Sequence, residues 1–373
     1  MHVLNKIPSL EVANVLNDWY VAIRKLQVDK SIELAEKAKA MTDEMEEDQE
    51  LLIYYSLLEH RHKILLYDLR GKIIPDRDKH VSDSFHNAKT SELTDYYFFL
   101  FEAMYEASNS NYDVAIGLYR EAEQKLSAIP DDIERAEFYF KMAWLYYRLD
   151  QHVLSLRYIR DALAIYKEKP DYNKKQALSL FLLAGNCTET GHYEKAESYY
   201  NEAENMIKLI NDPFLEAQLH HNKGILYSHW GKSALSITHL EKALTHSDYY
   251  KSEYYYNSSF MLIKELCIIG DRSRAQTILT EGRKRTSDDT SKVFIAKIDI
   301  LSILYLEEHH DNSLLRITEK LDLLENCHHT DSVKELSRLA AKVYEDKGFY
   351  QHAVALLNKS IEAEQKLKKL EWM

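Results

Sequence analysis

The feature that most constrains this chain is an internal repeat, clearest between residues 183 and 244. In each copy, a helical stretch that contains a small residue (Ala184 or Gly224) ends in a glycine (Gly191 or Gly231), and a second helical stretch follows. Glycine accepts the positive φ that commonly ends a helix, and small residues let two helices approach closely. Each copy therefore predicts two helices joined by a tight turn.

The same pattern continues along the chain in seven units, of which the sixth is degenerate. Equivalent small or apolar positions recur every 39 to 41 residues, and a second one follows seven residues later. One helix pair cannot bury its apolar face alone, so consecutive pairs should stack. The pattern is typical of tetratricopeptide repeats, although their usual period is ~34 residues. The first positions of the seven units are Ala115, Ser155, Ala196, Ser236, Ala275, Leu314 and Ala353.

Three stretches of helical periodicity precede the repeats, beginning near Pro8, Lys30 and Asp48. Three helices of this length predict a small bundle. The periodicity is then lost around Pro75 and returns at Tyr96. The sequence thus predicts an all-α chain with a three-helix bundle over residues 1–70, a linker or hinge over 71–95, and a tetratricopeptide-repeat superhelix of about seven helix pairs over 96–373.

Composition limits the functional classes. Nine glycines and five prolines in 373 residues leave few breaks between helices. A formal charge of −12 argues against direct nucleic-acid binding, which needs a cationic surface. No apolar run reaches the ~20 residues of a membrane span, no signal peptide is evident, and three widely spaced cysteines fit a reducing compartment. We therefore expect a cytoplasmic protein, without membrane contact, whose partners are proteins or peptides.

The densest acidic run, residues 43–50, ends at the third predicted helix and contains Gln49. Acidic residues favour a helix N-terminus because they oppose the positive end of its dipole. A neutral glutamine gains nothing from that effect, although it could simply be a first-turn residue. Its amide can both donate and accept hydrogen bonds, which suits the positioning of a water molecule.

Five stretches of the chain form a distinctive set of motifs. They are Asn17-Asp18-Trp19-Tyr20, Met45-Glu46-Glu47-Asp48-Gln49, residues 54–62, residues 131–138 and Ala184-Gly185-Asn186. In these motifs the chain resembles the Rap family of response-regulator aspartate phosphatases from bacilli. The resemblance implies a bundle that docks a response regulator and a repeat domain that binds a short, secreted and re-imported Phr-type peptide, as in the quorum sensing that controls sporulation and competence.

The resemblance assigns roles to residues of the bundle. Gln49 matches the family glutamine that enters the phosphoaspartate site of the regulator, where it would hold the attacking water. Glu47, Asp48 and Leu52 match positions that frame this contact. The chain itself would need no cofactor, because Mg²⁺ would belong to the partner regulator.

Two stretches depart from the family pattern. His60 stands in the presumed docking helix where the family commonly has an aromatic residue before Arg-His. The family sequence Gly-Leu-Leu-Glu-Tyr-Tyr appears here as residues 91–97, Ser-Glu-Leu-Thr-Asp-Tyr-Tyr. Both departures bear on which regulator is recognised.

In the repeats, the resemblance assigns peptide binding to Asn222 and Glu189. Asn222 matches an asparagine that pairs with the peptide backbone, and an amide suits this task because it offers a donor and an acceptor together. Glu189 replaces an aspartate that meets a basic peptide residue, so an altered peptide preference is expected. A solvent-facing polar residue is the alternative for Asn222.

The histidine pairs do not predict a metal site. Adjacent histidines such as His220 and His221 diverge on a helix, so surface or groove positions are the better interpretation. Three functions stay open: a peptide-controlled phosphatase of a response regulator, a non-catalytic module that sequesters a response-regulator transcription factor from DNA, and a generic repeat scaffold. The bundle motifs argue against the third.

Overall fold

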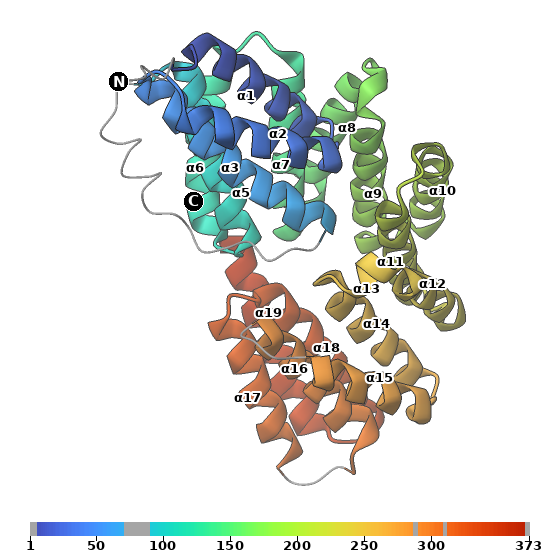
Figure 1. The fold of residues 1–373 in the computed structure, drawn as a ribbon. Coiled ribbons are helices and arrows are strands. Elements are labelled where there is room, and N and C mark those ends of the chain that lie inside the picture. The colour runs from blue at the N-terminus through green and yellow to red at the C-terminus, as the bar shows by residue number, and fades with distance from the viewer. Residues whose placement is uncertain (1–5, 71–89, 286–289, 309–311, 370–373) are drawn as a thin grey trace. The chain divides into compact units, whose positions relative to one another are not determined.

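The ordered elements of the chain are helices (Figure 1). The computed structural model describes residues 6–70, 90–285, 290–308 and 312–369. Within these ranges the one β contact is an isolated bridge between Ile7 and Met45. The prediction of an all-α fold is confirmed.

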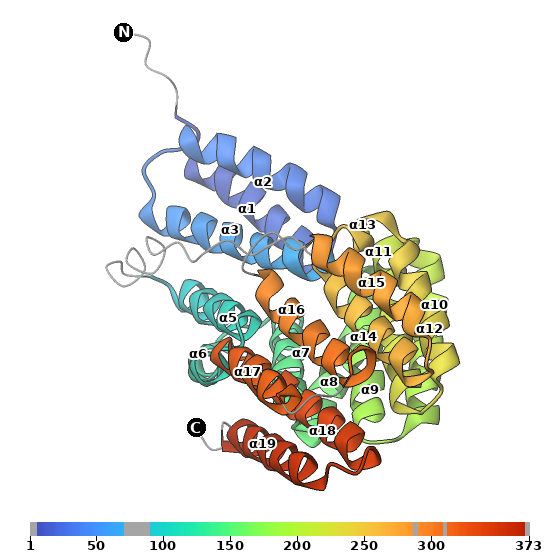
Figure 2. The same cartoon turned by 90° about the horizontal axis from the view of Figure 1, so that it is seen from below.

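The first three helices form the predicted bundle (Figure 2). They are α1 (Ser9–Arg24), α2 (Val28–Asp43) and α3 (Gln49–Arg70), and each packs against the other two. Helix α1 begins directly after Pro8, as the fixed φ of proline favours. Its apolar residues at helical spacing, Leu16 and Trp19 among them, are completely buried.

Seven helix pairs follow, which confirms the predicted number of repeats. The short elements are η1 (Pro170–Tyr172) and α13 (Ser247–Tyr250). The pairs are α5 (Glu92–Ser108) with α6 (Tyr112–Leu126), α7 (Asp132–Arg148) with α8 (His152–Lys167), α9 (Asn173–Glu189) with α10 (Tyr193–Ile210), α11 (Pro213–His229) with α12 (Ser233–Thr245), α14 (Tyr254–Ile268) with α15 (Arg272–Arg285), α16 (Thr290–Leu301) and the π-helix η2 (Ser302–Leu306) with α17 (Ser313–Asn326), and α18 (Thr330–Asp346) with α19 (Tyr350–Lys369).

The small positions of the repeats lie where helices approach each other. The first positions of the seven units are all buried except Leu314, which belongs to the degenerate sixth unit. At Gly224 an added Cβ would lie 2.6 Å from Cγ of Leu240, and at Gly282 it would lie 2.9 Å from Cζ of Phe294. Both contacts are too short for a side chain, so glycine is required there by packing.

The turns within six of the pairs, those whose turn residues the structure describes, use positive φ, with or without glycine. Gly191, Gly231, Gly270 and Gly348 have φ between 72° and 82°, as the repeat pattern predicts. Ser110 and Asp150 hold the same place in the first two pairs, with φ of 62° and 60°. Leu26 also has a positive φ, five residues before the buried Ser31, so the turn from α1 to α2 has the geometry of a repeat turn.

Most of the predicted linker, up to residue 89, lies outside the described residues. Its last four residues, Glu92 to Asp95, form the first turn of α5, whose N-cap is Ser91. The side chain of Ser91 accepts a hydrogen bond from the backbone N–H of Thr94 at 3.4 Å. The repeat domain therefore begins a few residues before Tyr96.

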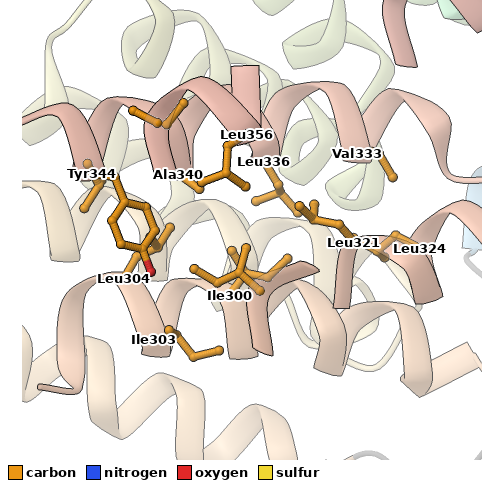
Figure 3. Packing of buried hydrophobic residues seen from close by; sticks show 14 of the residues in the cluster. Ile300, Ile303, Leu304, Leu321, Leu324, Val333, Leu336, Ala340, Tyr344 and Leu356 are labelled. Atoms are coloured by element: carbon orange, nitrogen blue, oxygen red, sulfur yellow. The ribbon is translucent and has the colours of Figure 1, made fainter. Parts of the chain in front are cut away.

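By packing, the chain divides into two compact units. The first comprises Met1–Trp144, Leu156–Leu180 and Met206–Asn211, and the second comprises Leu145–Ser155, Phe181–Asn205 and Asp212–Met373. In the first unit, the bundle packs together with α5 through α3. Part of the apolar core of the second unit is shown in Figure 3, where Leu321, Leu336 and Leu356 from α17, α18 and α19 meet Ile300 of α16.

Candidate functional site

The predicted catalytic residue, Gln49, is the first residue of α3 and its side chain is exposed. Asp48 precedes it and caps the helix: Oδ1 of Asp48 accepts a hydrogen bond from the backbone N–H of Leu51 at 3.0 Å. The Asp48 carbonyl accepts another from the N–H of Leu52 at 3.1 Å. Asp48, which we expected at the docking contact, therefore also starts the helix that carries Gln49.

Gln49 lies on an exposed face. Leu52 is one turn further along α3, on the side of Gln49, and 41% of its surface is exposed. Glu47 is exposed too. Among the described residues, none forms a hydrogen bond or ion pair with the side chain of Gln49 or Glu47. An amide, an acid and an apolar side chain are thus available to a partner at this helix end.

His60 lies apart from that helix end. It follows Gln49 by eleven residues, which is about 16 Å along the α3 axis on nearly the same face. Its ring centroid is 5.2 Å from that of Tyr105 in α5, and the residue is only half-exposed. The structure thus does not bring His60 together with Gln49, and its role in docking stays a prediction.

Glu50 joins the first turn of α3 to the start of α5. Its Oε1 accepts hydrogen bonds from the backbone N–H of Ser91 and from the hydroxyl of Thr94, both at 3.1 Å. Hydrogen bonding by Ser91 and Thr94 favours the ionised carboxylate and lowers the pKa of Glu50, with the Ser91 side chain contributing most. The residue after Gln49 is therefore held by a segment more than 40 residues away in sequence.

A cavity of about 400 Å³ lies beside this contact, between α1, α3 and α5. Glu50, Ser91 and Thr94 belong to its lining, and so do three aromatic residues, one from each helix: Tyr20, Tyr54 and Tyr97. The rings of Tyr54 and Tyr97 stack at a centroid distance of 5.7 Å. The cavity wall thus combines aromatic rings with polar and charged side chains.

Two buried acids of α7 connect the bundle to the repeats of the first unit. Glu134 accepts hydrogen bonds from Arg24 of α1 at 2.7 Å and from the hydroxyl of Tyr20 at 2.8 Å. One turn later, Glu137 accepts from Lys175 and lies 4.0 Å from Arg61 of α3. Each acid thus meets an arginine from a different helix of the bundle.

The pKa values of these two acids are shifted in opposite directions. Burial raises the pKa of Glu134 to about 7, and the opposing effects of Arg24 and Tyr20 do not cancel it. Burial acts in the same direction on Glu137, but Lys175 and Arg61 together hold the pKa of Glu137 below its usual value. The better-paired acid is therefore ionised, and Glu134 titrates near neutral pH.

The predicted peptide residues share a surface of the second unit. Asn222 and His229 are seven residues apart on α11, so they lie on one face of the helix, about 10 Å apart. Nδ1 of His229 is 3.9 Å from Oε2 of Glu189, at the end of α9. Asn222 is half-buried, and none of the described residues forms a hydrogen bond with its amide. The structure thus brings Asn222 and Glu189 to one surface.

Charged residues surround Glu189, and burial disfavours their charged forms. Burial raises the pKa of Glu189 and that of Glu335 in α18, and it lowers the pKa of His229. Asp331 of α18 is 3.6 Å from Arg148, and Lys334 bonds to Asp150. This surface therefore carries both signs of charge, and Glu189 is not fully compensated by its neighbours.

Two features are absent from the part of the chain that the structure describes. No group of three or more His, Cys, Asp or Glu side chains there is arranged to hold a metal ion. None of the helices there is both long and apolar enough to cross a bilayer.

Comparison with known proteins agrees with these motifs. A family model described as the N-terminal part of response regulator aspartate phosphatase H matches residues 6–67. Over the whole chain, 44% of residues are identical to regulatory protein RapK of Bacillus subtilis (strain 168), and 42% are identical to RapG of the same strain. These alignments cover 99% of this chain, and 99% and 100% of the two relatives. The chain belongs to the Rap family.

Other Rap proteins extend the comparison. Response regulator aspartate phosphatase H of B. subtilis (strain 168) is 33% identical over 97% of both chains. The structure of a Rap protein complexed with competence and sporulation factor superposes with a TM-score of 0.86, at 29% identity, over 97% of this chain and 100% of that chain. A Rap conjugation regulator of plasmid pLS20, in complex with the Phr* peptide, gives 0.69 at 26% identity over 98% of both. Rap relatives thus include named phosphatases and peptide complexes.

Sequence reasoning missed several residues at the two Rap surfaces. His229 could have been found, because its spacing of seven residues from Asn222 places both on one helix face. Glu50 was seen only as part of an acidic run. Its partners Ser91 and Thr94 were noticed as a departure from the family sequence, but nothing in the sequence linked them to Glu50.

Proposed function

We propose that this Rap protein inhibits a bacterial response regulator through the α1–α3 bundle and releases it when a short signalling peptide binds the second unit. Inhibition proceeds by dephosphorylation of the receiver aspartyl phosphate, with Gln49 positioning the attacking water. The observation that carries this proposal is the Gln49 amide, which is exposed on a capped first turn and has no partner among the described residues.

Dephosphorylation requires only a positioning group from the bundle. In phosphoryl transfer, positioning of the nucleophile and stabilisation of charge supply most of the rate. The regulator provides the aspartyl phosphate and Mg²⁺, while Gln49 can accept from the water and donate to a phosphoryl oxygen without a change in charge. Glu47 and Leu52, on either side, contact the regulator and hold this geometry.

The peptide site is the surface of Asn222 and Glu189. The Asn222 amide pairs with the peptide main chain, and the Glu189 carboxylate pairs with a basic side chain. Peptides that carry Lys or Arg are therefore preferred. Both partners are expected in the cytoplasm, without direct contact with nucleic acid or a membrane.

A second function has support from the relatives. RapK and RapG, at 44% and 42% identity, are named regulatory proteins, whereas the named phosphatase H is 33% identical. In this alternative, the same bundle surface sequesters a response-regulator transcription factor from DNA without removing phosphate. Gln49 would then be a docking residue only.

Phosphate loss from a panel of phosphorylated response regulators distinguishes the two functions. With the catalytic function, substoichiometric protein accelerates phosphate loss from at least one regulator, and peptide suppresses this effect. With sequestration, phosphate loss is unchanged, while DNA binding by one regulator falls as the protein approaches equimolar amounts. No effect on either readout would exclude both functions for the regulators tested.

A further inference from the structure

The contact between Glu50 and the start of α5 has no role in the function proposed so far. Glu50 directly follows Gln49, and its Oε1 accepts from both the Ser91 N–H and the Thr94 hydroxyl. Ser91 and Thr94 also bond to each other, since Ser91 is the N-cap of α5 and Thr94 its N3 residue. The partner of Glu50 is therefore the capped end of another helix. It is not a side chain in a loop.

The first turn of a helix needs such support. Its N–H groups have no partners within the helix, so a terminal turn frays unless side chains hold it. Asp48 supports the first turn of α3 locally, through the N–H of Leu51. Glu50 supports it through tertiary contact. Gln49 lies between the two, and its own side chain has no partner among the described residues.

We infer that Glu50 is a positioning residue for Gln49, fixing the direction of the Gln49 amide by tying the first turn of α3 to the N-cap of α5. This inference rests on the proposed function. A misplacement of about 1 Å of a reacting group can cost ~100-fold in rate, so a modest release of the turn is measurable. The tie also makes the placement of Gln49 depend on α5, the first helix of the repeats.

The sequence of the partner segment supports this assignment. Aligned on its two tyrosines, the family sequence Gly-Leu-Leu-Glu-Tyr-Tyr corresponds to residues 92–97, so Thr94 stands at a leucine position. Ser91 supplies the cap and Thr94 supplies a hydroxyl that bonds to Glu50. A leucine at the place of Thr94 could not donate this bond, because its side chain has no polar hydrogen. We call the two hydrogen bonds of Glu50 to Ser91 and Thr94 the clamp. The clamp therefore depends on the residues that this chain has at these positions.

The test is a set of four proteins assayed for dephosphorylation: wild type, Glu50→Ala, Gln49→Ala and the double variant. Glu50→Ala should lower kcat by about 10-fold with KM changed less than about twofold, because the turn loosens while the docking face stays. In the Gln49→Ala background, Glu50→Ala should have no further effect. A structural defect would instead lower activity in both backgrounds.

Two conservative variants distinguish the effect of the Glu50 hydrogen bonds from the effect of the Glu50 charge. Glu50→Gln removes the charge but keeps an oxygen that accepts from Ser91 and Thr94, so it should recover most of kcat. Thr94→Val removes one of the two bonds at nearly constant shape and should give a smaller loss than Glu50→Ala. Glu121→Ala removes an exposed acid of α6 and serves as the control, with wild-type kinetics expected.

Unchanged kcat in Glu50→Ala, an added loss in the Gln49→Ala background, or failure of Glu50→Gln to recover activity would each overturn the inference. If the wild type shows no phosphatase activity, the proposed catalytic function fails separately. Amide hydrogen exchange of residues 47–53 and 90–95 then decides on the clamp: Glu50→Ala should accelerate exchange in both segments and Glu50→Gln should not. Equal exchange in all variants would contradict it.

Discussion

The surfaces around Gln49 and Asn222 differ in how their supporting groups are satisfied. Near Gln49, Asp48 and Glu50 have hydrogen-bond partners, and the pKa of Glu50 is lowered. Near Asn222, burial raises the pKa of Glu189 and lowers that of His229, whose Nδ1 lies 3.9 Å from the Glu189 carboxylate. The first surface is preorganised before a partner arrives, whereas at the second a cationic ligand would add charge compensation that the neighbours of Glu189 supply only in part.

The difference has a functional meaning under the proposed mechanism. A group that acts on a phosphoryl bond must be held in place before the reaction, since positioning supplies the rate. A surface that senses a peptide instead needs a binding energy that depends on which peptide is present. A carboxylate whose charge is only partly compensated by its neighbours gives a favourable binding energy to a cationic ligand. The four predictions that follow test the two sides of this comparison, from the largest expected effect to the smallest.

The largest effect is expected for Arg24→Met, which breaks the support of the first surface. Arg24 bonds to Asp131 at 2.8 Å and to the buried Glu134 at 2.7 Å. Removal of one partner of a buried ion pair costs about 3 kcal/mol or more. Urea unfolding followed by tryptophan fluorescence, to which the buried Trp19 contributes, should show this loss. Arg135→Met, at an exposed arginine of α7, should change the unfolding free energy by less than ~0.5 kcal/mol. Equal losses in both variants would contradict the account.

The pH dependence of stability should report Glu134. Its pKa is raised to about 7 in the folded protein, so between its ordinary value and pH 7 the folded state binds more protons than the unfolded state. The unfolding free energy therefore falls as pH rises from 5 to 8, by on the order of 2–3 kcal/mol from this group. Glu134→Gln should lack this fall. Arg24, Asp131, Tyr20 and Tyr97 also face Glu134, so the comparison is made between the two proteins at each pH; parallel profiles would refute it.

On the second surface, Glu189→Gln should weaken mainly basic peptides. Loss of a bond that involves a charged group removes ~1.5–3 kcal/mol, which is roughly a 10- to 100-fold loss of affinity. Calorimetry with matched peptides that carry Lys or a neutral residue measures it. Glu194→Gln, at an exposed acid of α10, is the control. An equal loss for basic and neutral peptides would rule out the charge contact.

The smallest effect is expected for Asn222→Ala. Its amide pairs with the main chain, which all peptides share, so every peptide should lose affinity by a similar factor. A neutral hydrogen bond contributes ~0.5–1.5 kcal/mol, or about two- to tenfold. Unchanged affinity for all peptides would remove Asn222 from the site, and a loss confined to basic peptides would assign it a different role.

Local sequence rules predicted the helices and repeats well, because each repeat carries its own signals. A glycine in the sequence predicted four of the positive-φ turns. The same turn at Leu26, Ser110 and Asp150 contains no glycine, so no sequence signal predicted it. The resemblance between the α1–α2 turn and the repeat turns was therefore missed.

The candidate site was predictable only in part. Gln49 could be singled out from its acidic neighbours and from family motifs. The bonds of Glu50 to Ser91 and of Arg24 to Glu134 join residues far apart in sequence, where no periodicity or spacing predicts a contact. Burial, which sets the opposite pKa shifts of Glu134 and Glu137, is likewise a property of the folded packing.

The central claim is that Gln49 positions the water that attacks the aspartyl phosphate of a regulator. The most direct measurement is the rate of phosphate loss from a regulator that the wild type dephosphorylates, with Gln49→Ala at saturating concentration, together with the affinity of both proteins for that regulator. The account predicts a rate reduced by ~10-fold or more with affinity nearly unchanged, the behaviour of a misplaced reacting group. An unchanged rate at saturation would contradict it.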